Sequence, residues 1–252
     1  MFAKERHRAI IKLVREKRRL NFSDLSEAVS VSPATLRRDL AELEIAGELI
    51  RVHGGVLDPS YARSESSFDE RMLSNHEAKR KIALAAQELI PAGASVFVDA
   101  GSTCLEAGKA LLGRKDVTIL THSIALMAAG IHAEATLICL GGVLRKVSGA
   151  LVGGGALGSL ANLHADYALL GASGVTSEGC FTTELTEAEV KRAILDRSGR
   201  SILLCDTTKW QKSSVVKFAN WTKITDWALD RPLPFKASAE LRKAGVTFHL
   251  AS

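Results

Sequence analysis

Small and hydroxylated residues recur in several loops of this sequence, each placed where an apolar strand is expected to end. Asp99-Ala100-Gly101-Ser102-Thr103 directly precedes an expected helix, and Thr121-His122-Ser123 follows the next apolar run. Free backbone N–H groups at a helix start, together with hydroxyl groups, bind anions such as phosphate. Open α/β sheets bind ligands at the carboxyl ends of their strands. The pattern therefore predicts an anion site in the larger part of the chain.

Three further loops repeat this arrangement after later strands: Gly141-Gly142 with Arg145 and Lys146, Gly171 to Gly174, and Asp206 to Lys209. Each loop alone is weak evidence, because Gly, Ser and Thr are ordinary turn residues. Five loops at corresponding strand ends favour one pocket. If the Asp99 carboxylate pointed into the anion site, it would repel phosphate. We therefore expect Asp99 to cap backbone groups or to bind sugar hydroxyls. Two interpretations stay open for His122, a ligand donor or a structural histidine.

The elements that must position these loops alternate between strand and helix from His76 onward. Helical patterns cover 78–90, 103–112 and 186–198. Continuous apolar strands between helices are typical of a mostly parallel α/β sheet covered on both faces. The expected strands are 95–99, 117–121, 136–140, 167–170, 202–206, 225–229 and 246–250.

The first 57 residues have a different pattern, with three expected helices and a short strand pair. Residues 9–14 have apolar side chains at helical spacing, and a short second helix is expected around 25–29. Ser32 as N-cap and Pro33 at the first helical position begin a third helix, which Gly47 ends. The segment 49–56 then forms a strand pair. Two short helices joined by a tight turn and followed by a wing predict a winged helix-turn-helix.

The third helix has one face for the core and one for DNA. Leu36, Leu40 and Leu43 share the inner face. On the opposite face, Arg38 is expected to hydrogen-bond a guanine edge in the major groove, and Arg37 to contact a phosphate. The remaining expected DNA contacts come from this helix, its cap and the wing: Ser32, Ala34, Thr35, Arg51, His53 and Gly54.

Charge placement agrees with this prediction. The net charge is only +5, but residues 1–20 hold eight basic side chains and two acidic ones. A basic surface of this kind is typical of phosphate-backbone binding. The alternative is an ordinary solvated helix face, with Asp39 pairing locally with Arg37 and Arg38.

Composition excludes several classes of protein. Hydrophobic residues at 46% and charged residues at 24% are ordinary for a folded chain. No apolar run approaches the roughly 18 residues of a membrane span, and residues 1–8 lack the apolar core of a signal peptide, so we expect a cytoplasmic protein. The four cysteines form no CxxC pair, which predicts buried free thiols, no metal and no cofactor.

A polar, serine-rich segment without periodicity separates the two parts of the chain. It contains Asp58-Pro59-Ser60-Tyr61 and Arg63 to Ser67. Such composition is typical of a linker. We therefore expect a DNA-binding domain at 1–57, a linker at 58–75 and an α/β domain at 76–252.

The runs from Val29 to Leu40 and from Leu49 to Val56 resemble the winged-helix signature of DeoR-family bacterial transcriptional regulators. The resemblance continues through nearly all of the chain. It implies a C-terminal sensor domain similar to sugar-phosphate isomerases. Most members of this family are repressors that a phosphorylated sugar or a related metabolite releases from DNA.

The resemblance also assigns residues to the effector site. Asp99 to Thr103 resembles the motif D-x-G-T-T, Thr121 to Ser123 resembles T-N-S with histidine in the middle, and Asp206 to Lys209 matches D-x-x-K. Glu178 to Lys191 resembles E-G-x-x-T-T…E-x-x-x-K, which implies that Lys191 and Lys209 face the ligand. Glu187 and Lys191 alternatively pair with each other at i, i+4. The effector residues expected overall are Asp99, Gly101, Ser102, Thr103, Thr121, His122, Ser123, Gly142, Lys146, Gly171, Glu187, Lys191 and Lys209.

Two functions remain at this point. The first is a repressor of carbohydrate-metabolism genes that binds double-stranded operator DNA as a homodimer or homotetramer and is relieved by a phosphorylated sugar. The alternative is an isomerase-like enzyme with a fused nucleic-acid-binding module, in which Asp99, Glu187 and Lys191 supply acid and base groups. No pair of catalytic groups at fixed spacing supports the enzyme.

Overall fold

The computed structural model describes residues 3–17, 19–52, 55–58 and 66–251. The chain forms two compact units, Met1–Glu65 and Ser66–Ser252. Each unit has hydrophobic core residues of its own. The two are therefore considered separately.

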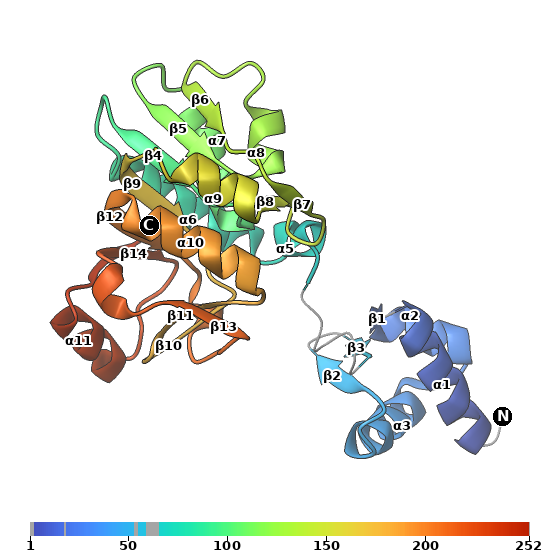
Figure 1. Ribbon diagram of the computed structural model, residues 1–252. Helices are drawn as coiled ribbons and strands as arrows, with labels where there is room; N and C mark the ends of the chain where they lie inside the picture. The colour runs from blue at the N-terminus through green and yellow to red at the C-terminus, as the bar shows by residue number, and fades with distance from the viewer. Residues whose placement is uncertain (1–2, 18, 53–54, 59–65, 252) are drawn as a thin grey trace. The chain divides into compact units, whose positions relative to one another are not determined.

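The smaller unit packs three helices against a small antiparallel sheet (Figure 1). The strand order is β1-β3-β2, so β3 lies between the other two. The core of this unit contains nine buried apolar residues among those described, and they come from all three helices and from the wing. The elements are α1 Ala3–Lys17, β1 Arg19–Asn21, α2 Phe22–Val29, α3 Pro33–Ile45, β2 Ile50–Val52 and β3 Gly55–Leu57.

Local capping explains where the helices of this unit begin and end. The Asn21 side chain accepts a hydrogen bond from the Asp24 backbone N–H at 2.8 Å and so caps α2. Ser32 caps α3 in the same way, through the Thr35 N–H at 3.2 Å. Gly47 follows α3 with a φ of 72°, a conformation that favours glycine. The expected helices and wing are present, whereas the three-residue strand β1 was too short for periodicity to reveal.

The larger unit is built on a seven-stranded sheet with the order β15-β14-β12-β9-β4-β5-β6. Every neighbouring pair in it is parallel. All seven strands expected from the sequence are present, and the prediction of a mostly parallel α/β sheet is confirmed. The strands are β4 Ser95–Val98, β5 Thr118–Thr121, β6 Thr136–Cys139, β9 Ala165–Leu170, β12 Ser198–Leu204, β14 Asp226–Leu229 and β15 Thr247–Leu250.

Helices cover both faces of this sheet, and each face has its own apolar core. Buried side chains of α6 and α7 pack with one face, and those of α9 and α10 pack with the other (Figure 1). Burial on both faces explains why the strands are largely continuous apolar runs instead of alternating polar and apolar residues. The helices are α6 His76–Glu88, α7 Ser102–Leu112, α8 Ile124–Ala129, α9 Gly154–Leu160, α10 Leu185–Asp196 and α11 Phe235–Lys243, with short 3₁₀ turns η1 Thr207–Lys209 and η2 Trp221–Lys223.

Two small antiparallel sheets were not expected from the sequence. One is a hairpin, β7 Val143–Arg145 with β8 Ala150–Val152. The other pairs β10 Gly174–Thr176, β11 Gly179–Thr182 and β13 Val216–Ala219. Strands of three or four residues are too short to show an alternation, so these sheets depend on tertiary packing.

Part of the expected linker is helical. Residues 68–73 form α5, Phe68–Leu73, which begins with a capping box between Ser67 and Glu70. Phe68 packs against the core of the larger unit, and its N–H donates to the Val147 carbonyl oxygen at 2.9 Å. This stretch therefore belongs to the larger unit, because an aromatic anchor and a cap together order a short segment.

The cysteines differ in part from the expectation. Cys104, Cys180 and Cys205 are buried free thiols, but Cys139 is exposed at the end of the edge strand β6. Burial raises the pKa of Cys180 and holds it well above the ordinary thiol range. None of the helices in the described ranges is both long and apolar enough to span a membrane.

Candidate functional site

Helix α3 exposes the face that the sequence assigns to DNA. Leu36, Leu40 and Leu43 are buried, whereas Arg37 and Arg38 are exposed. The Arg37 guanidinium lies 5.5 Å from the centre of the Phe22 ring, which holds it beside α2. The other expected contacts on this helix and its cap are exposed or half-buried: Ser32, Ala34 and Thr35.

Asp39 does not pair with the arginines that flank it. It is buried and accepts hydrogen bonds from Arg6 of α1, at 2.5 Å from Nε and 2.9 Å from Nη2. His7 Nε2 lies 3.1 Å from the same carboxylate. Arg38 makes no hydrogen bond or ion pair with any described residue. Local pairing with Asp39 is therefore wrong, and the Arg38 guanidinium is available to a ligand.

The wing is fixed to α3 through Arg51. Its backbone N–H donates to Glu44 Oε1 at 3.2 Å, and its guanidinium lies 3.7 Å from the same carboxylate. Arg51 is exposed, so it is attached to α3 and still accessible. The two other wing residues expected to contact DNA, His53 and Gly54, lie outside the described residues.

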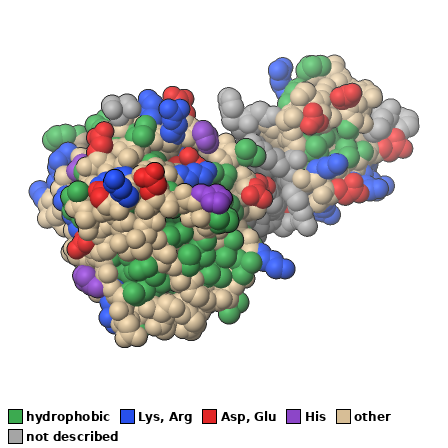
Figure 2. All heavy atoms as spheres, turned by 90° about the horizontal axis from the view of Figure 1, so that it is seen from above, with side chains coloured by type: hydrophobic (Ala, Val, Ile, Leu, Met, Phe, Trp, Pro, Cys, Tyr) green, Lys and Arg blue, Asp and Glu red, His purple; other side chains and the backbone are tan. Residues whose placement is uncertain are grey.

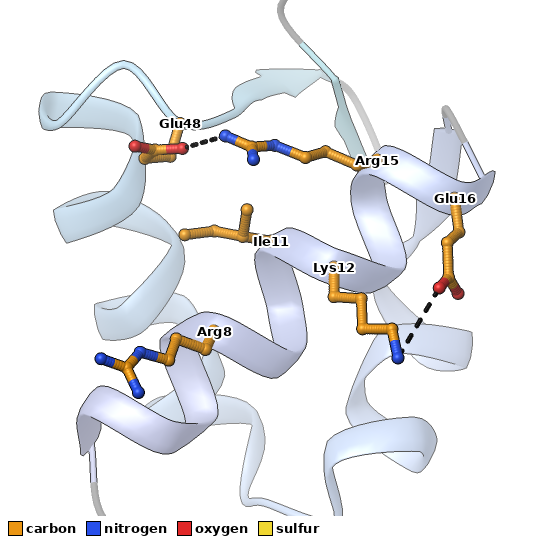
Figure 3. Close-up of a pocket in the computed structure, with 6 residues that line it drawn as sticks. All are labelled: Arg8, Ile11, Lys12, Arg15, Glu16 and Glu48. Atoms are coloured by element: carbon orange, nitrogen blue, oxygen red, sulfur yellow. Dashed lines mark hydrogen bonds and ion pairs between the residues drawn. The ribbon is translucent and has the colours of Figure 1, made fainter.

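The basic residues of α1 are not all available to phosphate. Arg6 is engaged by Asp39, and Arg15 donates to Glu48 at 2.8 Å. Lys12 lies 3.9 Å from Glu16. A hollow of about 530 Å³ lies along this helix. Figure 3 shows Ile11 between the charged side chains that line it. The basic surface of α1 is therefore smaller than the count of charges indicates, because Asp39, Glu16 and Glu48 each pair with one of its basic side chains.

Asp39→Ala is expected to destabilise the smaller unit, since it removes the carboxylate that accepts two hydrogen bonds from Arg6 and lies 3.1 Å from His7 Nε2. The hydrogen bond from Arg6 lowers the pKa of Asp39. A lowered folded pKa means that this stabilisation is present above the unfolded pKa of about 3.9 and is lost as the pH falls. Hydrogen exchange of the amides of α1 to α3 measures the effect. Glu42→Ala, at a side chain that is 58% exposed, is the control and should leave exchange unchanged.

The larger unit has its topological switch point between β4 and β9. From β4 the chain proceeds through β5 and β6 in one direction, and from β9 it proceeds through β12, β14 and β15 in the other. The loops that follow the neighbouring strands β4 and β9 therefore lead away from each other, which leaves a crevice at the carboxyl ends of these two strands. Such a crevice is the general ligand site of open α/β sheets. Asp99 to Gly101 follows β4, and Gly171 follows β9.

A buried ion pair lies at this switch point. Lys191 of α10 donates to Asp99 Oδ2 and, at 3.0 Å, to the Gly171 carbonyl oxygen. The Gly171 N–H donates to the same Asp99 oxygen at 2.9 Å. Burial alone would raise the pKa of Asp99 and lower that of Lys191, but their mutual attraction reverses both shifts. The pair is therefore charged, and Asp99 caps backbone as expected.

His122 and its neighbours hold the adjoining loop. His122 Nδ1 lies 3.0 Å from the Leu151 carbonyl oxygen and must donate to it, and Nε2 lies 3.1 Å from Asp99 Oδ1. The Thr121 hydroxyl donates to the Val98 carbonyl oxygen at 2.7 Å. Ser123 Oγ accepts from the Leu126 N–H at 3.3 Å and caps α8. All three expected ligand residues thus have structural partners in the loop.

Glu187 and Lys191 do not pair with each other, although they lie one turn apart. Glu187 accepts from Arg145 at 3.1 Å and from the Thr182 hydroxyl at 3.0 Å. Arg145 therefore joins the hairpin β7–β8 to α10, whereas its expected neighbour Lys146 is exposed at the hairpin turn. Lys146, and not Arg145, was expected at the effector site, because the sequence does not show which side chains of an unexpected hairpin point inward.

The first turn of α7 carries two hydroxyls without partners. Ser102 and Thr103 are 6% and 8% exposed, and neither side chain makes a hydrogen bond to another described residue. Gly101 precedes the helix and supplies no side-chain cap. The first backbone N–H groups of a helix have no partner within the helix, and they carry its positive dipole end. This turn therefore has the kinds of hydrogen-bond donor that an anion site requires.

Lys209 and Gly142 occupy two other loops. Lys209 lies half-buried at the end of η1, and its ammonium has no partner within the described part of the chain. Asp206, which begins this loop, accepts from the Asn75 side chain at 3.4 Å. Gly142 has a φ of 135°, and a Cβ there would meet the Val152 carbonyl oxygen at 2.7 Å. Gly142 is thus required by the hairpin itself.

Lys191→Ala is expected to lower the free energy of unfolding of the larger unit by about 3–5 kcal/mol, because Asp99 would remain buried without a counter-charge. The measurement is urea unfolding followed by tryptophan fluorescence, since all three tryptophans, Trp210, Trp221 and Trp227, lie in this unit. Adding Asp99→Asn to the variant should recover part of the loss. A single-mutant loss below about 1 kcal/mol would contradict the assignment of a buried charged pair.

The comparisons with known proteins cover both units. The DeoR-like helix-turn-helix domain matches residues 6–60, and the DeoR C terminal sensor domain matches residues 74–231. Among solved structures, ribose 5-phosphate isomerase A from Methanocaldococcus jannaschii is 19% identical, with a TM-score of 0.41 over 54% of this chain and 55% of that chain.

Two relatives match along almost their whole length. The glycerol-3-phosphate regulon repressor of Escherichia coli (strain K12) is 31% identical over 91% of this chain and 92% of that protein. The HTH-type transcriptional regulator GlpR of Haloferax volcanii is 33% identical over 98% of this chain and 97% of that protein. The chain therefore belongs to the DeoR family and is a transcriptional regulator with an N-terminal helix-turn-helix domain and a C-terminal sensor domain.

Proposed function

We propose that this regulator represses carbohydrate-metabolism genes and that a phosphorylated sugar releases it from operator DNA. The observation that carries the proposal is the first turn of α7, where the hydroxyls of Ser102 and Thr103 have no hydrogen-bond partner among the described residues and lie beside the first backbone N–H groups of the helix. An effector phosphate would satisfy these donors. The glycerol-3-phosphate regulon repressor, by its name, controls genes for a small phosphorylated polyol, which is the same ligand chemistry.

Charge balance favours Lys209 as the cationic phosphate contact. Lys191 is already neutralised by Asp99, whereas the ammonium of Lys209 has no acidic partner among the described residues. Asp99 and Gly171 then form the floor of the site through their hydrogen bond. The site thus combines one available cation, two hydroxyls and a helix start, which suits a phosphate monoester.

Binding without catalysis is the second part of the proposal. A general base must reach the proton that it removes, with a pKa near the working pH. Lys191 and Asp99 instead hold each other in the charged form, and Glu187 is held by Arg145 and Thr182. These groups are engaged in structure, which favours a sensor over an isomerase.

The DNA-binding part is proposed to comprise residues 1–57, with α3 in the major groove and Arg38 at a guanine edge. A single small recognition helix buries too little surface for tight specific binding, so operator recognition requires at least two copies of the chain. Effector binding would favour an arrangement of the two copies that does not fit both half-sites.

Isothermal titration calorimetry of the full chain with a panel of sugar phosphates and their unphosphorylated sugars tests the effector assignment. Saturable binding of one phosphate, with no binding of its parent sugar, is the expected result. Turnover of a phosphate, followed by NMR in the same samples, would instead support the isomerase alternative. Absence of both binding and turnover across the panel would contradict a phosphorylated sugar as the effector.

A further inference from the structure

The outer strand of the β7–β8 hairpin exposes apolar side chains on both of its faces. Val143 is 71% exposed and Leu144 is 47% exposed. Successive residues of a strand point to opposite faces, so one of two neighbours is ordinarily buried. Here both side chains stay exposed among the residues that the structure describes. The strand therefore presents two apolar surfaces at once.

Exposed apolar residues from adjoining segments extend this surface. The Ile124 N–H donates to the Gly149 carbonyl oxygen at 2.9 Å, which places the start of α8 beside the hairpin turn. Val147 in that turn is 41% exposed and Ile124 is 39% exposed. Figure 2 shows hydrophobic side chains gathered over one part of the larger unit. Patches of this kind mark interaction sites on soluble proteins.

The hydrogen-bonding edge of β7 is also unpaired. Within the described ranges β7 pairs with β8 alone, so one side of its backbone has no strand beside it. Folded proteins ordinarily protect such edges with charged side chains or with bulges. The one charged residue of β7, Arg145, instead directs its guanidinium to Glu187. An open apolar edge is an aggregation hazard unless a partner covers it.

Hydrogen bonds with His122 and Phe68 fix the hairpin to the rest of the larger unit. The Leu151 N–H of β8 donates to the His122 carbonyl oxygen at 2.8 Å, and Leu151 accepts from His122 Nδ1. The Phe68 N–H donates to Val147 on the turn. A preorganised edge of this kind loses little conformational entropy when it binds.

We propose that β7 and its apolar surroundings form the surface through which two copies of this chain associate. An antiparallel edge is complementary to its own copy across a two-fold axis, so β7 pairs with β7 of the second chain. Val143 and Leu144 carry no charge, which excludes DNA and phosphate as occupants. The choice of a second copy rests in part on the proposed function, because operator recognition requires two recognition helices.

Leu144→Lys tests the interface in the full chain without DNA or effector. Sedimentation of the parent should show a dimer or a larger assembly. The variant should dissociate at a concentration at least about tenfold higher, because two ammonium groups would enter one symmetric apolar interface. Phe235→Lys is the matched control, since Phe235 on α11 is 88% exposed and lies outside this surface. It should sediment like the parent, and the circular dichroism spectra of both variants should match that of the parent, which shows that both are folded.

Two results would overturn the proposal: a parent that is monomeric at tens of micromolar, or a Leu144→Lys variant that associates as tightly as the parent. Neither depends on DNA, so the two proposals fail separately. A dimer that does not bind operator DNA specifically contradicts the proposed function alone. A monomeric chain that binds a sugar phosphate contradicts the interface and the requirement for two copies on the operator, and leaves the effector assignment standing.

Discussion

Arg38→Ala is expected to abolish specific operator binding while effector binding remains intact. The guanidinium is exposed on the outer face of α3 and has no partner within the described residues. A bidentate contact with a guanine contributes about 1–3 kcal/mol of discrimination per half-site. Two half-sites then give roughly 2–6 kcal/mol, so affinity should fall at least about 30-fold. Fluorescence anisotropy with operator and scrambled DNA measures this loss.

Two matched variants separate sequence readout from charge. Arg37→Ala is expected to weaken binding to operator and scrambled DNA alike and to reduce the salt slope by about two, because one phosphate contact is lost in each of the two half-sites. Arg80→Ala removes the same charge from an exposed position on α6, and it should change neither the affinity for DNA nor the salt slope. If Arg38→Ala binds operator as tightly as the parent, α3 does not read DNA through this side chain.

Lys209→Ala is expected to give a repressor that no longer responds to its effector. The ammonium is half-buried beside the carboxyl end of β12 and has no acidic partner among the described residues. Hydrogen bonds between charged groups contribute about 1.5–3 kcal/mol, so effector affinity should fall roughly 10- to 150-fold. Operator affinity without effector should equal that of the parent.

The control for this experiment lies three residues further along the chain. Lys212 is exposed, so Lys212→Ala removes the same charge without changing the candidate site. A normal effector response in Lys209→Ala would remove this loop from the site. Loss of operator affinity in the same variant would indicate that the substitution disturbs the fold instead.

Elements with a continuous apolar run or with clear capping residues could be predicted from the sequence. The seven parallel strands and the three helices of the smaller unit belong to this class, because continuous apolar runs and capping residues are local signals. The loops after β4 and β9 could be placed at the same sheet edge for that reason. The hairpin β7–β8 could not, since three residues do not define a period.

Pairings between distant side chains were also beyond the sequence. Lys191 and Asp99 are separated by 92 positions, and Arg6 and Asp39 by 33. In both cases a nearer candidate partner existed, Glu187 for Lys191 and Arg38 for Asp39. Local spacing favours the nearer partner, whereas packing of whole elements decides which charges become buried together. The assignment of Arg145 to α10 depends on the same tertiary information.

Operator binding in the presence of effector tests the central claim most directly. The measurement is fluorescence anisotropy of the full chain with DNA from upstream of its own gene and of the neighbouring operon, at physiological salt, against scrambled DNA. Specific binding that one sugar phosphate weakens, and that its unphosphorylated sugar does not, is the result that this account predicts. Binding without sequence preference, unchanged by every phosphate in the panel, would contradict it.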